Sequence, residues 1–267
     1  MRHRLLVRLT IGFATVLGAL ALLLGGAVSA AAAGQNYVAL GDSYSSGVGA
    51  GDYTDDSGDC DRSPNAYSQL WADANSPSSY VSVACSGATT ADVVADQLSA
   101  LTSATTLVSI TIGGNDENFA GIMEDCNLGS DDTCVSEIQG AEDDANATLP
   151  GKLASLYAQI ADRSPSARIV VLDYPHFYDL ANDCVGLSQT KRAKIDEGID
   201  VLDGILAQSA ADAGATFADV RGAFAGHEIC DDNRWLHSVN FTQFTESYHP
   251  TADGHAQAYY PTFAAAA

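Results

Sequence analysis

Short apolar runs rich in β-branched residues alternate with longer helical patterns along this chain, and no other sequence feature constrains its fold as strongly. Each run ends in Gly, Asp or another turn signal, as buried strands do. Such alternation favours a parallel sheet with helices on both faces. The sequence therefore predicts an α/β protein, a three-layer α/β/α sandwich around a five-stranded parallel sheet. The expected strands are Asn36–Leu40, Tyr80–Ala84, Leu107–Gly113, Arg168–Asp173 and Ala215–Asp219.

Helical patterns fill the intervals between these strands. Pro150 lies inside the third of them and predicts a break there, because proline lacks the N–H that the helix needs. Ser188 is a plausible cap for the fourth, and Gly214 is its stop. The expected helices are Ala66–Ala74, Thr90–Leu98, Cys134–Arg163 and Ser188–Gly214.

The N-terminus is typical of a secretory signal peptide. Met1 to Arg8 carries three arginines and no acid, an apolar stretch runs from Leu9 to about Val28, and small residues follow. A transmembrane anchor is the alternative, but the small-residue exit favours cleavage. We expect residues 1–33 to be the signal peptide, with cleavage near 30–33, and residues 34–267 to form a single domain in an extracellular protein.

The net negative charge of the chain argues against polyanionic partners. The chain has 34 acidic and 12 basic side chains and a net charge of −22, and three of the basic residues lie in the expected signal peptide. Like charges repel, so we expect no binding to nucleic acid or to anionic membrane. The acidity is typical of a soluble secreted protein.

All six cysteines follow the expected signal peptide, and an even number in an exported chain predicts three disulfides. Metal binding usually needs closely paired ligands such as C-x-x-C, which the sequence lacks, so we expect no metal and no cofactor. Six cysteines allow 15 pairings. We expect the sequential one, Cys60–Cys85, Cys126–Cys134 and Cys184–Cys230.

Four short segments carry polar or glycine residues at expected strand ends or near the C-terminus. Ligands of open parallel sheets bind beyond the carboxyl ends of the strands. Gly41-Asp42-Ser43 follows the first strand, Gly87 the second and Asn115 the third, while His249 precedes a proline near the C-terminus. Each segment alone could be an ordinary turn or cap. Ser43 does not lie in the nucleophile-elbow motif G-x-S-x-G, which disfavours an ordinary α/β-hydrolase.

Together the four segments resemble the GDSL-type lipases of the SGNH hydrolase superfamily, particularly small extracellular lipases and phospholipases A1 of actinobacteria. The resemblance covers nearly all of residues 34–267 and implies a flavodoxin-like sheet. It implies that Ser43 is the nucleophile and His249 the general base. The oxyanion hole would consist of the backbone N–H groups of Ser43 and Gly87 and the side-chain amide of Asn115.

The group that orients His249 is left open. Many members of the superfamily have an aspartate three residues before the histidine, and Glu246 stands there in this chain. The backbone carbonyl of Ser247 is the alternative. Asp42 adjoins the nucleophile, and we interpret it as a turn or cap residue.

The expected function is hydrolysis of lipid esters, as a lipase, a phospholipase A1 or both. We expect a monomer that contacts lipid surfaces only transiently. One alternative is a carbohydrate esterase that removes acetyl groups from a polysaccharide, which would need a polar groove. Another is a catalytically inactive binding module, although the chain retains all four of the quoted groups.

Overall fold

The computed structural model describes residues 34–182, 184–240 and 242–267. The expected signal peptide, residues 1–33, lies outside this range. Across the described part of the chain, none of the helices combines the length and the apolar character needed to cross a membrane.

A single sheet of five parallel strands forms the centre of the protein, in the order β2-β1-β3-β4-β5. This confirms the predicted fold class. All five residues of β3 are buried, as in a central strand covered on both faces. The strands are β1 (Asn36–Gly41), β2 (Ser79–Ser82), β3 (Leu107–Thr111), β4 (Arg168–Leu172) and β5 (Thr216–Ala218).

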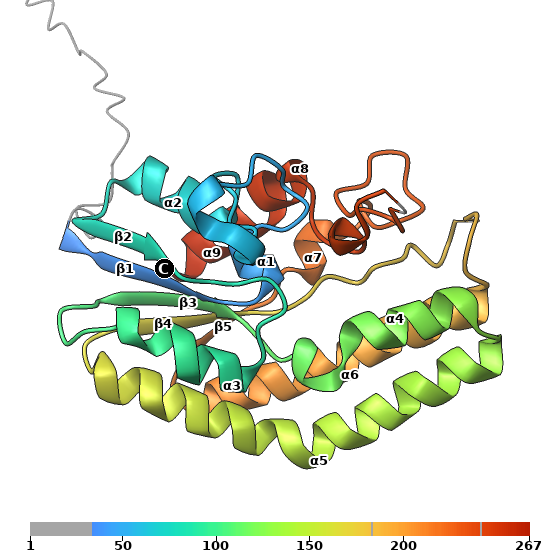
Figure 1. Cartoon of the computed structure of the whole chain (residues 1–267), viewed down its shortest axis with the longest axis horizontal. Helices are drawn as coiled ribbons and strands as arrows, with labels where there is room; N and C mark the ends of the chain where they lie inside the picture. Colours follow the sequence, from blue (N-terminus) through green and yellow to red (C-terminus); the bar gives the residue numbers. More distant parts are fainter. Residues whose placement is uncertain (1–33, 183, 241) are drawn as a thin grey trace, which may run out of the picture.

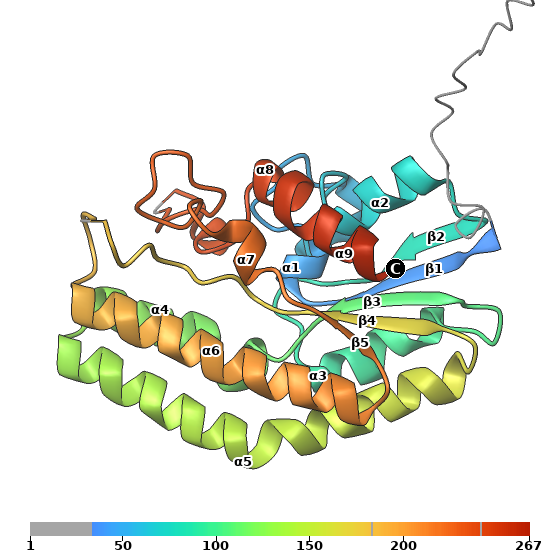
Figure 2. The same ribbon diagram turned by 180° about the vertical axis from the view of Figure 1, so that it is seen from behind.

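Helices cover both faces of the sheet (Figures 1 and 2). One face carries α2 (Tyr67–Asn75) and α9 (Tyr260–Ala266), where Trp71 and Phe263 pack on the ring of Tyr37. The other carries α3 (Thr90–Asp92), α5 (Asp131–Arg163) and α6 (Gln189–Asp212). The remaining α-helices of the described chain are α1 (Ser43–Ser46), α4 (Phe119–Leu128), α7 (Arg221–Phe224) and α8 (Ala252–Gly254).

The predicted break at Pro150 is wrong. α5 continues through this residue from Asp131 to Arg163, and its ribbon bends without ending (Figure 1). A proline costs one backbone hydrogen bond, which an exposed bend tolerates when the buried face stays continuous. Leu149, Leu153 and Leu156 supply that face, and all three are fully buried.

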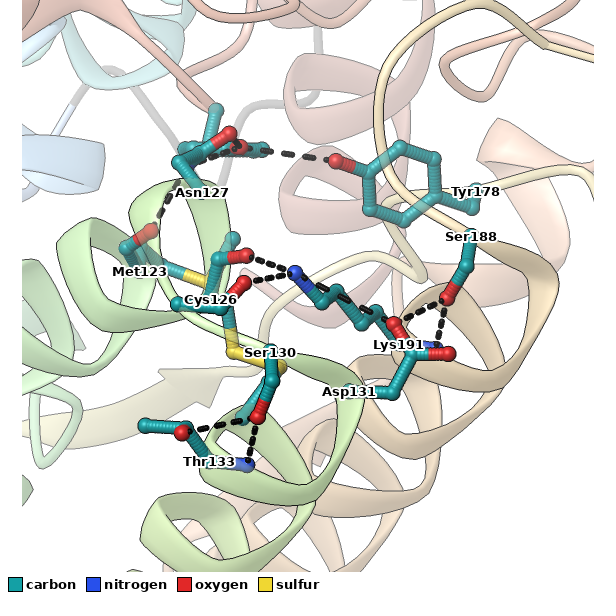
Figure 3. Close-up of a disulfide and its surroundings, with 12 residues drawn as sticks. Met123, Cys126, Asn127, Ser130, Asp131, Thr133, Tyr178, Ser188 and Lys191 are labelled. Carbon is teal, nitrogen blue, oxygen red and sulfur yellow. Dashed lines mark hydrogen bonds and ion pairs between the residues drawn. A yellow bond between two sulfur atoms is a disulfide. The ribbon is translucent and has the colours of Figure 1, made fainter.

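A disulfide and a lysine hold the ends of α4, α5 and α6 together (Figure 3). Cys126 near the end of α4 is bonded to Cys134 in α5. From α6, Lys191 Nζ donates hydrogen bonds of 2.7 Å to the carbonyl oxygens of Cys126 and Gly129. A cation suits these unpaired carbonyls, because the C-terminal end of a helix carries partial negative charge.

The cysteines form the expected sequential pairs, Cys60–Cys85, Cys126–Cys134 and Cys184–Cys230. Three disulfides are typical of proteins that fold in an oxidising compartment.

Candidate active site at the carboxyl ends of the strands

Ser43 is the first residue of α1, directly beyond the carboxyl end of β1. Gly41 makes the sharp exit possible, because its φ is +123° and a Cβ there would lie 2.4 Å from the carbonyl oxygen of Thr111. Ser45 Oγ accepts a hydrogen bond from the Thr111 backbone N–H, which ties α1 to β3. The serine side chain is 8% exposed, so its hydroxyl is reached through a cleft.

Asp42 is the N-cap of α1, as its sequence position indicates. Its carboxylate accepts hydrogen bonds from the backbone N–H of Tyr44 and from the hydroxyls of Thr111 and Tyr174. Burial raises the pKa of Asp42 to about 6, even though the Thr111 and Tyr174 hydroxyls lower it. The carboxylate thus holds the Ser43 turn in place.

His249 reaches Ser43 from the C-terminal part of the chain. Its Nε2 lies 2.7 Å from Ser43 Oγ, within hydrogen-bonding distance. The loop that carries His249 is fixed by a short antiparallel pairing with the segment around His237. The His237 N–H donates to the His249 carbonyl, and the Tyr248 N–H donates to the His237 carbonyl. Tyr44 adds a third link, because its hydroxyl donates to the Tyr248 carbonyl at 2.7 Å.

The other nitrogen of His249 meets a backbone carbonyl. Nδ1 donates a hydrogen bond of 3.0 Å to the Ser247 carbonyl oxygen. Glu246 is turned to different partners: its Oε1 accepts from the hydroxyl of Tyr53 at 2.8 Å, and that hydroxyl accepts from the Gly49 N–H. Of the two orienters considered from sequence, the Ser247 carbonyl therefore contacts the imidazole, and the Glu246 carboxylate hydrogen-bonds to Tyr53.

Gly49 is a site residue that the sequence analysis missed. Its φ is +89°, and a Cβ there would lie 2.6 Å from the Pro250 carbonyl oxygen and 3.0 Å from His249 Cβ. The His237 ring also faces it, with Nε2 2.8 Å from the Gly49 carbonyl oxygen. The glycine therefore lets the segment after α1 pack directly against the His249 loop. The sequence signal was weak, since Gly47, Gly49 and Gly51 form a glycine-rich stretch without showing what packs on it.

Gly87 and Asn115 lie at the same cleft as Ser43 and His249. The φ of Gly87 is +78°, a conformation that exposes the backbone at the end of β2. Asn115 Nδ2 donates to the Ala88 carbonyl at 3.1 Å, which fixes the amide beside that turn. The Cys60–Cys85 disulfide and a hydrogen bond from the Ser86 N–H to the Cys60 carbonyl hold the turn from the outside. The structure thus brings together all four segments that the sequence singled out.

The cleft has a volume of about 210 Å³ and is mainly apolar. Ser43, His249 and Asn115 are among its polar residues, while much of the remaining wall is aromatic and aliphatic, a composition typical of sites that bind apolar ligands. That wall includes Phe119, Met123, Phe177, Ile199, Leu202 and Phe244.

Burial sets the ionisation of the imidazole. It lowers the pKa of His249 to about 4, outweighing the Ser247 carbonyl, which raises it. A neutral imidazole beside a hydroxyl is the form that can accept a proton. Ser43 and His249 can therefore act as a nucleophile and base at neutral pH.

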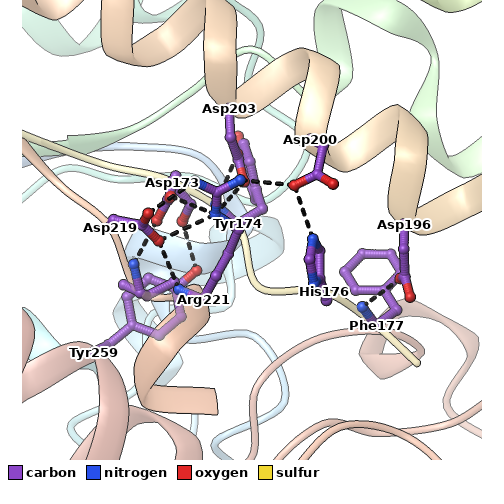
Figure 4. Close-up of polar contacts among 11 residues, drawn as sticks. Asp173, Tyr174, His176, Phe177, Asp196, Asp200, Asp203, Asp219, Arg221 and Tyr259 are labelled. Carbon is purple, nitrogen blue, oxygen red and sulfur yellow. Dashed lines mark hydrogen bonds and ion pairs between the residues drawn. The ribbon is translucent and has the colours of Figure 1, made fainter. Parts of the chain in front are cut away.

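A buried acidic cluster supports the floor of the site (Figure 4). The Tyr174 N–H donates to Asp203 Oδ1, and the Val220 N–H donates to Asp173 Oδ1. Arg221 lies near both carboxyl groups, with Nε 3.7 Å from Asp173 Oδ2 and 3.6 Å from Asp203 Oδ2. Burial raises the pKa of Asp173 and of Asp203, and the charge of Asp173 raises that of Asp203 further. The cluster fixes Tyr174, whose hydroxyl in turn holds Asp42.

His255, another histidine of the C-terminal segment, belongs to the core. It is fully buried, and its Nδ1 accepts a hydrogen bond from the Tyr67 N–H. Burial lowers the pKa of His255 to about 3, so it is a neutral core residue. Within residues 34–182, 184–240 and 242–267, no group of three or more His, Cys, Asp or Glu side chains is arranged to hold a metal ion.

Comparison with known proteins gives consistent matches. The model of the GDSL-like Lipase/Acylhydrolase family matches residues 39–257. Lipase 1 of Streptomyces coelicolor is 53% identical over 255 residues, which cover 94% of this chain and 95% of that protein. The crystal structure of phospholipase A1 from Streptomyces albidoflavus NA297 superposes with a TM-score of 0.87 at 50% identity, covering 88% of this chain and 100% of that one. The extracellular lipase from Streptomyces rimosus superposes with a TM-score of 0.85 at 48% identity, covering 87% and 100%.

Proposed function

The chain belongs to the GDSL-like lipase/acylhydrolase family, and from that premise we propose that it is a secreted enzyme that cleaves lipid esters with Ser43 and His249. As a member of the family it is a carboxylic ester hydrolase. The proposal concerns the residues that perform the reaction and the substrate they act on. The observation that carries it is the 2.7 Å contact between Ser43 Oγ and His249 Nε2 at an apolar cleft.

In the proposed mechanism, Ser43 Oγ attacks the ester carbonyl carbon while His249 Nε2 takes the hydroxyl proton. The negative charge that develops on the carbonyl oxygen is held by the N–H groups of Ser43 and Gly87 and by the Asn115 amide. Loss of one such donor typically costs about 10²–10³ in rate. The imidazolium then protonates the departing alcohol, which leaves an acyl group on Ser43.

Water completes the cycle by the reverse sequence. His249 removes a proton from the water, the hydroxide adds to the acyl carbon, and Ser43 recovers its proton as the acid departs. The Ser247 carbonyl accepts a hydrogen bond from the Nδ1–H group throughout and keeps the ring oriented. The proposed catalytic pair therefore needs no carboxylate. The 3.0 Å contact supports this role, while Glu246 is held by Tyr53.

Lipid esters are the proposed substrates, with the enzyme acting as a lipase, a phospholipase A1 or both. The wall of the cleft supports this, since Phe119, Phe177 and Leu202 suit hydrocarbon rather than sugar. A polysaccharide deacetylase would need a polar groove. The proteins called lipase 1 and phospholipase A1 are similar over nearly the whole described chain.

Secretion is proposed from residues 1–33 and from the disulfides. The leader has the pattern of a signal peptide, and three disulfides suit an oxidising compartment. We further propose a monomer that contacts lipid surfaces transiently, because a net charge of −22 disfavours lasting adhesion to anionic surfaces.

The test compares the wild-type protein with Ser43→Ala on para-nitrophenyl esters of increasing chain length, on phosphatidylcholine vesicles and on acetyl-xylan. The proposal expects hydrolysis of long-chain esters and phospholipid by the wild-type protein alone. Activity confined to acetyl-xylan and acetyl esters would replace it with carbohydrate deacetylation. Equal activity in Ser43→Ala would overturn the proposed mechanism.

A further inference from the structure

A second apolar cavity, of about 80 Å³, lies between α4, α5 and α6. These helices run side by side and project past the carboxyl ends of the strands, away from the sheet (Figures 1 and 2). Ile122 of α4, Ile138 of α5 and Ile195 of α6 each face the space from one helix. The cavity is therefore lined mainly by these three helices.

Small residues leave this space open. Ala141 and Ala145 line it from α5 and Gly198 lines it from α6, and none of the three has a side chain that extends beyond Cβ. A Cβ at Gly198 would lie 2.9 Å from Ile138 Cγ2. The glycine thus allows α5 and α6 to approach, while the two alanines stop short of filling the gap between them.

The cavity adjoins the cleft that holds Ser43. Five residues line both spaces, so the two spaces share a wall. This wall is aromatic and aliphatic apart from one glycine at its outer end. The shared residues are Gly114, Phe119, Met123, Ile199 and Leu202.

Polar groups border the inner cavity at its margins. Glu142 forms an ion pair with Lys194, in which Lys194 Nζ lies 2.7 Å from Glu142 Oε2. This charged pair marks one limit of the apolar lining of the cavity. Glu117 also borders the cavity, and its carboxyl oxygens have no hydrogen-bond partner among the described residues. Burial raises the pKa of Glu117 above its ordinary value.

We propose that the cavity between α4, α5 and α6 receives the distal part of the substrate's acyl chain, so that side chains of α5 and α6 set the preferred chain length. This rests on the proposed function and deepens it, because it names long-chain acyl esters as the substrate class. Each methylene of the acyl chain that leaves water for an apolar site strengthens binding. The expected effect is about a fourfold increase in kcat/KM per methylene. A short ester would end in the outer cleft and gain nothing from the inner cavity.

The test fills the cavity. Ala141→Leu adds bulk to a residue that lines the inner cavity but not the Ser43 cleft, and Ala147→Leu makes the same change at an exposed position of the same helix. The readout is the ratio of kcat/KM for the palmitate ester to that for the butyrate ester. We expect this ratio to fall by roughly tenfold or more in Ala141→Leu, equivalent to at least two buried methylenes, and to stay unchanged in Ala147→Leu.

A second variant works in the opposite direction. Ile138→Ala enlarges the inner cavity and should shift the preference toward longer chains, with thermal unfolding used to show that the protein is folded. Binding gives a readout independent of turnover. A fluorescent fatty acid should bind Ser43→Ala, and adding Ala141→Leu to that variant should weaken its binding.

The outcomes separate this proposal from the proposed function. If the wild-type protein hydrolyses no ester, or if Ser43→Ala remains active, the proposed function fails first. If hydrolysis depends on Ser43 but a folded Ala141→Leu or Ile138→Ala keeps the wild-type chain-length ratio, only the acyl cavity is overturned. Unchanged fatty-acid affinity in the Ala141→Leu double variant would also overturn it.

Discussion

The Nδ1 atom of His249 lies 3.0 Å from the carbonyl oxygen of Ser247, two residues earlier in the chain. The carboxylate of Glu246 is instead held by the Tyr53 hydroxyl. A backbone carbonyl can fix the orientation of an imidazole, but it adds no negative charge beside the ring. This arrangement separates two roles that an aspartate performs together in a catalytic triad.

Glu246→Gln should therefore retain most of the activity. Glutamine keeps an oxygen that can accept from Tyr53, and the His249 contact with Ser247 is untouched. We expect a loss of only a few-fold in kcat, against on the order of 10⁴-fold or more for His249→Ala. Steady-state kinetics on one para-nitrophenyl ester give both values, and a loss in Glu246→Gln equal to that in His249→Ala would refute the carbonyl as sole orienter.

Gly49→Ala should displace His249 without removing any catalytic group. The new Cβ would lie 2.6 Å from the Pro250 carbonyl oxygen and 3.0 Å from His249 Cβ. A shift of about 1 Å in a catalytic group can cost on the order of 10²-fold in rate, so we expect a loss of that size in kcat.

Gly51→Ala is the matched control for this variant. Gly51 also has a positive φ, +71°, but nothing lies within 4 Å of a Cβ placed there. It should show a strain cost of about 1–2 kcal/mol in the free energy of unfolding and a near-normal kcat. Equal kcat losses in the two variants would show that strain, rather than the contact with His249, is responsible.

The acidic limb of the pH profile of kcat/KM should lie at an unusually low pH. His249 must be neutral to accept the Ser43 proton, and burial lowers its pKa to about 4. As pH falls, kcat/KM should therefore hold through pH 6 and decline only as pH approaches about 4. The pH profile of kcat/KM checks this, with circular dichroism to confirm folding at each pH, and a midpoint near the ordinary histidine value of about 6.5 would contradict it.

The Cys60–Cys85 disulfide should matter for rate as well as for stability. It holds the turn that carries Gly87, since the Ser86 N–H also donates to the Cys60 carbonyl. The double variant Cys60→Ser/Cys85→Ser should lose about 2–4 kcal/mol in the free energy of unfolding. Because the Gly87 N–H, a proposed oxyanion donor, becomes less well placed, kcat should also fall by roughly tenfold or more.

Removal of Cys184–Cys230 provides the comparison for that prediction. This disulfide closes a longer segment, with a sequence separation of 46 against 25. No described residue within two positions of its cysteines lines the cleft, whereas Ser86 and Gly87, which follow Cys85, do. Loss of Cys184–Cys230 should lower stability by a similar amount and leave kcat nearly unchanged. Denaturant unfolding and kinetics on the same samples separate the two effects.

The sequence predicts the sheet from local patterns, and it predicts the four site segments from their order along the chain and their resemblance to GDSL-type lipases. Buried parallel strands appear as short β-branched runs, and the rule that ligands bind at strand ends points to Ser43, Gly87 and Asn115. The strand boundaries differ from the expected ones by only a residue or two. β2, for example, is Ser79–Ser82, where Tyr80–Ala84 was expected.

What the sequence could not show are contacts between distant segments. Nothing local to Gly49 indicates that it packs on His249, 200 residues away. The spacing of Glu246 resembles that of a triad acid, yet Tyr53 holds it in a different direction. Helix α5 continues past Pro150 because its buried leucines outweigh one lost hydrogen bond, an energetic balance that a residue-by-residue rule does not contain.

The central claim is that Ser43 is the nucleophile, and covalent labelling tests it most directly. The wild-type protein and Ser43→Ala would each be treated with a long-chain para-nitrophenyl phosphonate, followed by intact-mass measurement and peptide mapping. The account predicts one adduct per wild-type chain, located on Ser43, with activity lost in proportion to labelling and no adduct in Ser43→Ala. An adduct on another residue, or an active wild-type enzyme that resists labelling, would contradict it.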